Sequence, residues 1–285
     1  MLLTLSHIQA TPLLAAHKAG ATAVAISLDL NRTLTPCDLS AAGLHLPTGG
    51  VLDWPSVEEA AESENACFHI TTGEDGRPTL RKINFFSEEL QRAYTLYPTH
   101  RAPTMLVSGI TMHRIVDCDP HEDTLNKIKA VGKVTGDVLD TTMGLGYTAI
   151  MAAQTAASVL TIELDPTVEE VCRLNPWSQE LFTNPRISRR IGHAWDVVEE
   201  LPAAHFSVVL HDPPMFNMAG ELYAQDFYAE LYRVLKGNGR LFHYIGNPAS
   251  KSGATTTRGA IRRLQAAGFR RVEPRPAAFG VLAVK

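Results

Sequence analysis

Two short segments, about seventy residues apart, place acidic side chains where apolar runs end. In the first, residues 138–140 (Val-Leu-Asp) lead through a turn of small residues into a sequence typical of a helix. In the second, the apolar run 206–210 is followed by residues 211–214 (His-Asp-Pro-Pro). Ligands of open α/β sheets bind beyond the carboxyl ends of the strands. We therefore expect Asp140 and Asp212 to border one site.

The turn after Asp140 fits two kinds of nucleotide site. Residues 144–149 (Gly-Leu-Gly-Tyr-Thr-Ala) match the dinucleotide fingerprint G-x-G-x-x-A, and Glu163 follows about twenty residues later to accept hydrogen bonds from ribose hydroxyls. A carboxylate at Asp140 would repel a pyrophosphate, whereas it would attract a sulfonium and an α-ammonium. The residues therefore favour S-adenosylmethionine as the cofactor, with a turn that binds no ligand as the alternative. The predicted cofactor contacts here are Asp140, Thr142, Gly144, Gly146 and Glu163.

Asp196 is a further acidic residue that follows a predicted strand, at 187–191. Its carboxylate is placed to accept a hydrogen bond from an adenine amino group, so we predict Asp196 as one more cofactor contact. The alternative is that Asp196 caps the N-terminus of a short helix at 197–201.

The segment Asp212-Pro213-Pro214 is the predicted catalytic centre. Two successive prolines fix φ and hold Asp212 in an extended conformation. The Asp212 side chain and a nearby carbonyl then form a stiff pair of acceptors, which can hold both hydrogens of an amino group and align its lone pair. Phe216 is placed to stack on a planar acceptor. A proline-stiffened loop without a catalytic role is the alternative.

The pattern around these segments predicts a doubly wound α/β sheet, because apolar strands and amphipathic helices alternate from about residue 136 onward. The predicted strands are 138–140, 159–163, 187–191, 206–210, 240–245 and a closing pair at 271–274 and 281–284. The predicted helices are 147–157, 167–174, 221–235 and 255–267.

Residues 1–118 are predicted to form a separate, smaller α+β domain that helps to select the acceptor, and residues 119–285 to form the catalytic domain. The N-terminal part has β-like segments broken by turns and one acidic helix, at 56–63. The connection 119–132 contains a helical piece. The β-like segments are 22–30, 66–72, 79–86 and 104–108.

Composition indicates a soluble globular protein, with 285 residues of which 45% are hydrophobic and 20% charged. No apolar run approaches the roughly 20 residues that span a bilayer, and the first residues lack a secretory leader pattern, so we expect a cytoplasmic protein. The four cysteines are far apart, which favours free thiols. The eleven histidines show no metal-ligand spacing, and no metal is predicted.

Charge is distributed unevenly along the chain. Residues 251–285 hold eight basic side chains and one acidic one, whereas the rest holds 18 basic and 29 acidic residues, a net charge of −11. The basic C-terminal region is expected either to contact phosphates or another anion, or to be an ordinary solvated surface.

Taken together, these residues resemble class I S-adenosylmethionine-dependent methyltransferases, and more closely a family of predicted methyltransferases best known from archaea. The resemblance covers most of the chain. It rests on the segments Ser108-Gly109-Ile110-Thr111-Met112-His113-Arg114, Leu139-Asp140-Thr141, Gly144-Leu145-Gly146-Tyr147-Thr148-Ala149, Leu174-Asn175-Pro176-Trp177-Ser178, His211-Asp212-Pro213-Pro214, Ala219-Gly220-Glu221-Leu222-Tyr223 and Leu241-Phe242-His243-Tyr244.

The resemblance implies a seven-stranded, Rossmann-like sheet with a reversed last strand and cofactor contacts at the residues named above. The segment Asp212-Pro213-Pro214 is similar to the D/N-P-P-aromatic motif of enzymes that methylate amino nitrogens. This chain departs from the motif at Met215, where an aromatic residue is usual and Phe216 follows one place later. It departs again at Thr142, which replaces the first glycine of the usual turn.

Several other polar residues are candidates for contact with the acceptor substrate. His113 and Arg114 precede the catalytic domain and are predicted either as a substrate clamp or as an ordinary interdomain contact. His211, His243 and Tyr244 flank strand ends and are predicted either to line the acceptor pocket or to pack in the core.

The leading hypothesis is an S-adenosylmethionine-dependent methyltransferase that acts on an amino nitrogen of an RNA base or a small amine. The alternative on the same fold is an aminopropyl or aminocarboxypropyl transferase. A third hypothesis is a non-catalytic cofactor-binding module that docks RNA or protein. The identity of the acceptor and the oligomeric state do not follow from the sequence.

Overall fold

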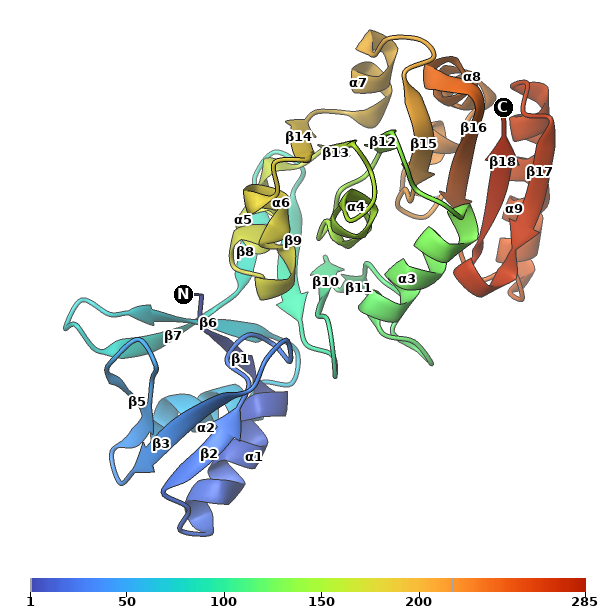
Figure 1. The fold of residues 1–285 in the computed structure, drawn as a ribbon. Helices are drawn as coiled ribbons and strands as arrows, with labels where there is room; N and C mark the ends of the chain where they lie inside the picture. The colour runs from blue at the N-terminus through green and yellow to red at the C-terminus, as the bar shows by residue number, and fades with distance from the viewer. Residues whose placement is uncertain (1, 217) are drawn as a thin grey trace. The chain divides into compact units, whose positions relative to one another are not determined.

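The computed structural model describes residues 2–216 and 218–285, which form two compact units (Figure 1). The first unit comprises Met1–His121 and Thr167–Gln179, and the second comprises Glu122–Pro166 and Glu180–Lys285. The first division lies close to the predicted boundary between residues 118 and 119. The segment Thr167–Gln179, which the sequence assigned to the catalytic domain, clusters with the N-terminal unit instead.

The second unit is built on one seven-stranded sheet with the order β14-β13-β12-β15-β16-β18-β17 (Figure 1). The strands from β14 to β16 pair in parallel, whereas β18 is antiparallel to both of its neighbours. The predicted Rossmann-like sheet with a reversed last strand is therefore confirmed. Its strands are β12 (Asp137–Asp140), β13 (Ser158–Glu163), β14 (Ile187–Ile191), β15 (Phe206–His211), β16 (Leu235–Tyr244), β17 (Arg271–Arg275) and β18 (Gly280–Val284).

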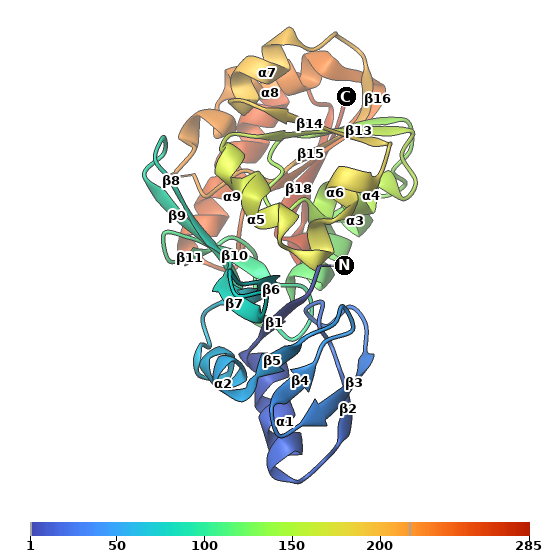
Figure 2. The same cartoon turned by 90° about the vertical axis from the view of Figure 1, so that its left-hand side faces the viewer.

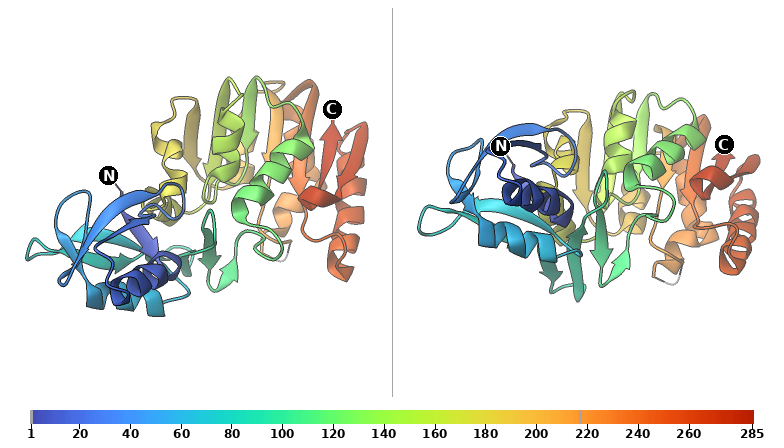
Figure 3. Two further views of the ribbon diagram at one scale, coloured as in Figure 1. Left: turned by 60° about the horizontal axis from the view of Figure 1, so that its bottom comes forward. Right: turned by 90° about the horizontal axis from the view of Figure 1, so that it is seen from below.

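Helices cover both faces of this sheet, because its central strands are apolar on both sides. Val138 and Leu139, which point to opposite faces of β12, are both fully buried. One face packs against α7 (Ala194–Glu200), α8 (Gln225–Val234) and α9 (Lys251–Ala266) in a single apolar core. Figure 3 shows α9 beside the C-terminal strands β17 and β18, which it contacts.

The small helix α4 (Tyr147–Ala153) packs against β12, β13 and β14. Its alanines, including Ala149, Ala152 and Ala153, are fully buried, so the helix lies close to the sheet. The second unit also holds most of α3 (Pro120–Val131), together with α6 (Glu180–Thr183) and the 3-10 turns η2 (Gly220–Tyr223) and η3 (Pro276–Ala278). Nearly all of α5 (Pro166–Arg173) and the 3-10 turn η1 (Pro176–Ser178) belong to the first unit.

Three predicted helices have different bounds. The helix predicted at 147–157 ends earlier, at Ala153. The segment 221–235 is the turn η2 followed by α8, and Leu235 already belongs to β16. The sequence Gly237-Asn238-Gly239 therefore interrupts a strand rather than ending a helix: Phe206 pairs with Leu235 but Val208 pairs with Arg240, so the intervening residues bulge out. The helix predicted at 255–267 begins earlier, at Lys251, because the Ser250 hydroxyl caps its N-terminus.

The first unit is an α+β structure with three small antiparallel sheets, whose strands are labelled in Figure 2. Its core lies between the N-terminal strands and two helices, α1 (His7–Lys18) and α2 (Trp54–Glu62). The strands are β1 (Thr4–Ser6), β2 (Ala23–Ile26), β3 (Thr35–Ser40), β4 (Gly43–His45), β5 (Val51–Asp53), β6 (Cys67–Thr72), β7 (Pro78–Lys82), β8 (Asn84–Ser87), β9 (Arg92–Tyr97), β10 (Thr104–Val107) and β11 (Ile110–Thr111).

Helix α1 was not predicted from the sequence. It begins with a capping box in which Ser6 and Gln9 satisfy each other's backbone amides, and it continues through Pro12. A proline inside a helix removes one backbone hydrogen bond and argues against helix on local grounds. Burial of Ala10 and Leu13 in the core of the first unit compensates for that loss.

The segment Thr167–Gln179 is held within the first unit by contacts around Trp177. The Trp177 indole donates a hydrogen bond to the Leu30 carbonyl at 2.8 Å. The Arg32 guanidinium lies over the same ring and donates to the Pro176 carbonyl. These contacts explain why residues that lie between two strands of the large sheet in sequence belong to the other unit.

Across the described residues, no helix has the combination of length and apolar character that a membrane span requires. The four cysteines are free thiols, as predicted, with Cys37, Cys67 and Cys172 buried and Cys118 half-buried.

Gly146 carries a steric requirement that can be tested. It has a φ of 76° at the N-terminus of α4, and a Cβ placed there would overlap the side chain of Leu181. We expect Gly146→Ala to lower the free energy of unfolding by about 2–4 kcal/mol, from backbone strain and overpacking together. Gly246→Ala is the matched control, because Gly246 also has a positive φ but faces open space. Urea denaturation that gave equal losses for both variants would contradict the steric argument.

Candidate active site

Three of the predicted acidic residues lie at the carboxyl edge of adjacent strands. Asp140 ends β12, Glu163 ends β13, and Asp212 directly follows β15. Since β13, β12 and β15 are consecutive neighbours in the sheet and run parallel, their carboxyl ends meet at one edge. The charges of Asp212 and Glu163 both act on Asp140. The sheet thus brings together residues that are far apart in sequence.

Asp140 is completely buried at this edge. Its Oδ2 atom accepts a hydrogen bond of 2.7 Å from the Thr161 hydroxyl, whereas Oδ1 is buried without a partner in hydrogen-bonding geometry. Burial raises the pKa of the Asp140 carboxyl to about 8; the Thr161 hydrogen bond opposes this shift, and the negative charges of Asp212 and Glu163 add to it. A bound cation would relieve both the repulsion and the unsatisfied oxygen.

Glu163 is hydrogen-bonded to the glycine turn. Its Oε2 atom accepts from the Gly144 amide at 2.9 Å, and Oε1 accepts from the Asp165 amide at 3.1 Å. Burial raises the pKa of Glu163, and these amides partly offset the shift. Each carboxylate oxygen keeps a second lone pair, so Glu163 can hold the turn and still accept from the hydroxyls of a ligand.

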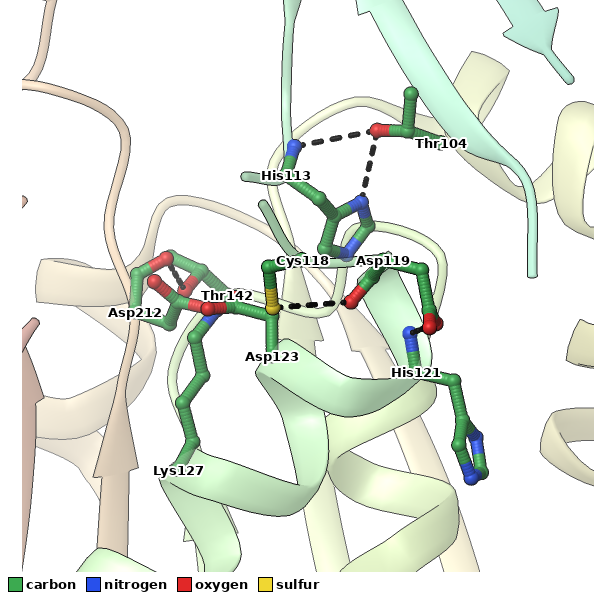
Figure 4. A network of polar contacts seen from close by, with 9 residues as sticks. All are labelled: Thr104, His113, Cys118, Asp119, His121, Asp123, Lys127, Thr142 and Asp212. Atoms are coloured by element: carbon green, nitrogen blue, oxygen red, sulfur yellow. Dashed lines mark hydrogen bonds and ion pairs between the residues drawn. The ribbon is translucent and has the colours of Figure 1, made fainter. Parts of the chain in front are cut away.

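Thr142 links the turn to the proline loop. Its hydroxyl donates a 2.7 Å hydrogen bond to the backbone carbonyl of Asp212, as the close-up in Figure 4 shows. A glycine at this position could not make that contact. The departure from the usual glycine turn therefore has a structural role, because it fixes the predicted catalytic segment against the predicted cofactor turn.

The proline loop is fixed on both sides of its prolines, and the residues that follow it are exposed. The Tyr223 hydroxyl donates to the Pro214 carbonyl at 3.1 Å, which fixes the loop directly after the prolines. Met215 and Phe216 follow with about half of their surface exposed, and the Phe216 ring meets Tyr223 edge to face at 5.3 Å. Phe216 is thus free to contact a ligand on its outer face.

Sequence analysis did not identify Asp123 and Lys127, which lie on α3. The Lys127 ammonium contacts Asp212 Oδ2 at 2.6 Å and Asp123 Oδ2 at 2.8 Å (Figure 4). The ammonium also lies 4.5 Å from the centre of the Tyr244 ring. Tyr244 is half-buried and was predicted to contact the acceptor substrate. An acidic and a basic residue four positions apart are common on solvated helices, so no local signal marked this pair.

His211 and His243 belong to the core, which resolves the alternative left open for them. Both are fully buried and both have pKa values lowered by burial, to about 4 for His211. The His211 ring bonds the Thr141 hydroxyl and the Leu222 carbonyl. The His243 ring bonds the Tyr228 hydroxyl and the His211 carbonyl. Each ring is neutral, with both nitrogens occupied.

Asp196 lies in the first turn of α7 with its side chain exposed. The N-cap of this helix is His193, so the alternative in which Asp196 caps a helix at 197–201 is wrong: the helix begins earlier than the apolar pattern indicated. A role for Asp196 in binding adenine stays a prediction.

His113 and Arg114 belong to the first unit and are half-buried. The His113 ring and backbone amide both bond the Thr104 hydroxyl, which orients the imidazole within that unit (Figure 4). Their part in substrate binding stays a prediction. Within residues 2–216 and 218–285, no group of three His, Cys, Asp or Glu side chains is arranged to hold a metal ion.

Comparison with known proteins gives one relative and several similar folds. The chain is 41% identical over 266 residues to Uncharacterized protein MJ1233 of Methanocaldococcus jannaschii, covering 91% of this chain and 88% of that protein. No family model matches. A spermidine synthase in complex with the transition state analogue AdoDATO covers 76% of this chain and 78% of its own, with a TM-score of 0.58 and 16% identity. The match to the spermidine synthase of Thermotoga maritima covers 76% of this chain and 77% of that one, with a TM-score of 0.55 and 16% identity. Likeness at this level shows the fold.

The raised pKa of Asp140 predicts a pH-dependent stability. Because the folded protein binds a proton at Asp140 up to about pH 8 and the unfolded chain releases it near pH 4, this residue stabilises the fold below pH 4 and loses that contribution as the pH rises to 8. Asp140→Asn should remove the loss and be more stable than the wild type at pH 8.5, by an amount on the order of a few kcal/mol. Denaturation curves at pH 5 and 8.5 test this, with the surface variant Asp226→Asn as the control. The prediction would be contradicted if the difference in free energy of unfolding between the wild type and Asp140→Asn were the same at pH 8.5 as at pH 5.

Proposed function

The chain belongs to the same family as Uncharacterized protein MJ1233 of Methanocaldococcus jannaschii, and we propose that it is an S-adenosylmethionine-dependent methyltransferase that acts on an amino nitrogen. The single observation that carries this proposal is the buried Asp140 carboxyl, with one oxygen unsatisfied, beside a glycine turn and next to the Asp212-Pro213-Pro214 loop. The Rossmann-like fold with a reversed last strand supports it.

The residues at the strand edge fit a cationic adenosyl cofactor. Asp140 offers an unpaired buried oxygen to a positive charge. Gly144 and Gly146 have positive φ, which glycine adopts without strain, so the turn can present its backbone to a ligand. Glu163 would accept from ribose hydroxyls, and Asp196 is proposed for the adenine amino group. When bound, S-adenosylmethionine supplies a methyl carbon already activated by the sulfonium.

The remaining task of the protein is alignment, for which effective molarities correspond to about 7–11 kcal/mol of the barrier. Asp212 and the carbonyls of the proline loop are proposed to hold the two hydrogens of the acceptor amino group. The Thr142 hydroxyl and the Tyr223 hydroxyl fix that loop from both ends. The exposed Phe216 ring supports a planar acceptor, such as a base of RNA, over an aliphatic one.

A basic surface supports an anionic part of the acceptor. The described part of the molecule has a cavity of about 310 Å³ lined by Arg262 and Arg263 of α9 together with Gln225 of α8. The Arg263 side chain donates to the Tyr223 carbonyl, so this cavity is connected to the residue that fixes the proline loop. We propose that a phosphate of the acceptor contacts this region.

Aminopropyl transfer is the second candidate function. Spermidine synthases share the fold, and the one described above was crystallised with a transition state analogue. The acidic residues at the strand edge would also suit a polyamine acceptor. The two reactions differ in the nucleoside product, which is S-adenosylhomocysteine for methyl transfer and methylthioadenosine for aminopropyl transfer.

Calorimetric titration tests cofactor binding. We expect S-adenosylmethionine to bind more tightly as the pH rises toward about 8, because the Asp140 carboxyl must lose its proton to meet the cation. Asp140→Asn should weaken binding by roughly 10- to 100-fold and remove this pH dependence. Asp212→Asn should leave binding nearly unchanged. No binding by the wild type at any pH would end the proposal.

Product analysis tests the reaction itself. Incubating the protein with cell extract and S-adenosylmethionine should give S-adenosylhomocysteine, and Asp212→Ala, which removes the side-chain acceptor, should abolish it. Separate RNA and small-molecule fractions identify the acceptor class. Methylthioadenosine formed from decarboxylated S-adenosylmethionine would instead establish the second candidate function.

A further inference from the structure

The ion pairs of Lys127 with Asp123 and Asp212 differ from ordinary surface ion pairs because they are largely buried. The Lys127 ammonium lies between Asp123 and Asp212, and the three side chains are 4%, 0% and 22% exposed, respectively. A buried group of charges costs desolvation energy that its mutual attraction barely offsets, so such networks contribute little to stability. The network needs another explanation, and one of its members is the predicted catalytic aspartate.

The geometry restricts Asp212 to one arrangement. Lys127 occupies the Oδ2 atom of Asp212 at 2.6 Å, while the Thr142 hydroxyl holds its backbone carbonyl. Asp123, which is fully buried, and the ring of Tyr244 hold the ammonium from other sides. Both the side chain and the backbone of Asp212 are thereby fixed, and Figure 4 shows Asp212 with Asp123, Lys127 and Thr142.

We propose that Lys127, held by Asp123, is a positioning residue that orients Asp212, so that Oδ1 is left to accept the amino group of the acceptor. The inference rests on the proposed function, which it deepens by assigning two residues of α3 to the acceptor half of the site.

The charges that face Asp212 set its protonation. Lys127 and Asp123 act on it from α3. The charge of Asp212 in turn acts on Asp140 of β12 and on Tyr223 of η2. Tyr244, at the end of β16, lies against the Lys127 ammonium. Burial raises the pKa of Asp212, Lys127 lowers it, and Asp123 raises it again. The pKa of Lys127 lies above its usual value, because the two carboxylates outweigh its burial, so the ammonium stays charged. Removing either partner should therefore shift Asp212 in a known direction.

Two variants of α3 should move the titration of Asp212 in opposite directions. Lys127→Met keeps the apolar volume but removes the cation, so the pKa of Asp212 should rise by one unit or more, a tenfold or larger change in proton affinity. Asp123→Asn removes the competing carboxylate, so the pKa of Asp212 should fall. Asp123→Asn keeps the lysine paired and is the variant expected to fold like the wild type. Carbon-13 NMR of labelled aspartate carboxyls, with Asp212→Asn to assign the signal, measures both shifts without an acceptor substrate.

Turnover then separates a positioning role from a structural one. With the acceptor fraction that the wild type methylates, Lys127→Met should lower kcat by about 100-fold and shift the acid limb of the pH profile upward, while affinity for S-adenosylmethionine stays unchanged. Lys129→Met, which removes an exposed lysine of the same helix, is the control. An Asp212 titration that neither variant moves would overturn the inference, as would turnover that survives the shift. If the wild type binds no cofactor yet the NMR shifts occur, the proposed function fails and the ion network stands.

Discussion

The burial of negative charge at the edge of a parallel sheet is the constraint on which the rest of this structure depends. Asp140 is enclosed where three strands end, and the nearby carboxylates of Glu163 and Asp212 make its ionisation more costly still. Without a ligand, the cost is reduced by a bound proton and by the Thr161 hydroxyl. The proposed function follows from this electrostatic character, because an ionised Asp140 beside a glycine turn would attract the positive charge of an adenosyl cofactor.

The two halves of the site are joined by hydrogen bonds rather than by sequence proximity. The cofactor turn and the proline loop come from different strands, yet the Thr142 hydroxyl bonds the carbonyl of Asp212. On the other side, Lys127 bonds the Asp212 carboxylate. A reaction that relies on alignment needs this kind of rigidity, because small displacements of the acceptor lower the rate steeply. The exposed Phe216 lies just beyond the fixed part.

The sequence alone determined the fold class and the acidic edge. Alternating strands and helices imply a doubly wound sheet, and in such a sheet the carboxyl ends of neighbouring strands must meet, so Asp140, Glu163 and Asp212 were identified from their places after apolar runs. The wide spacing of the four cysteines likewise predicted that they form no disulfide. The role of each acidic residue in binding or catalysis remains a prediction that solution measurements must test.

Only the tertiary structure decided which other residues join the site. Lys127 and Asp123 look like a surface pair in sequence, because nothing local shows which face of α3 is buried or what lies opposite. Likewise, the neutral, core-packed state of His211 depends on partners from distant segments. Helix α1 forms despite Pro12, and the segment Thr167–Gln179 joins the first unit through Trp177, because burial outweighs local preference. These features depend on contacts between residues that are distant in sequence. Periodicity and spacing indicate only the secondary structure that each segment favours by itself.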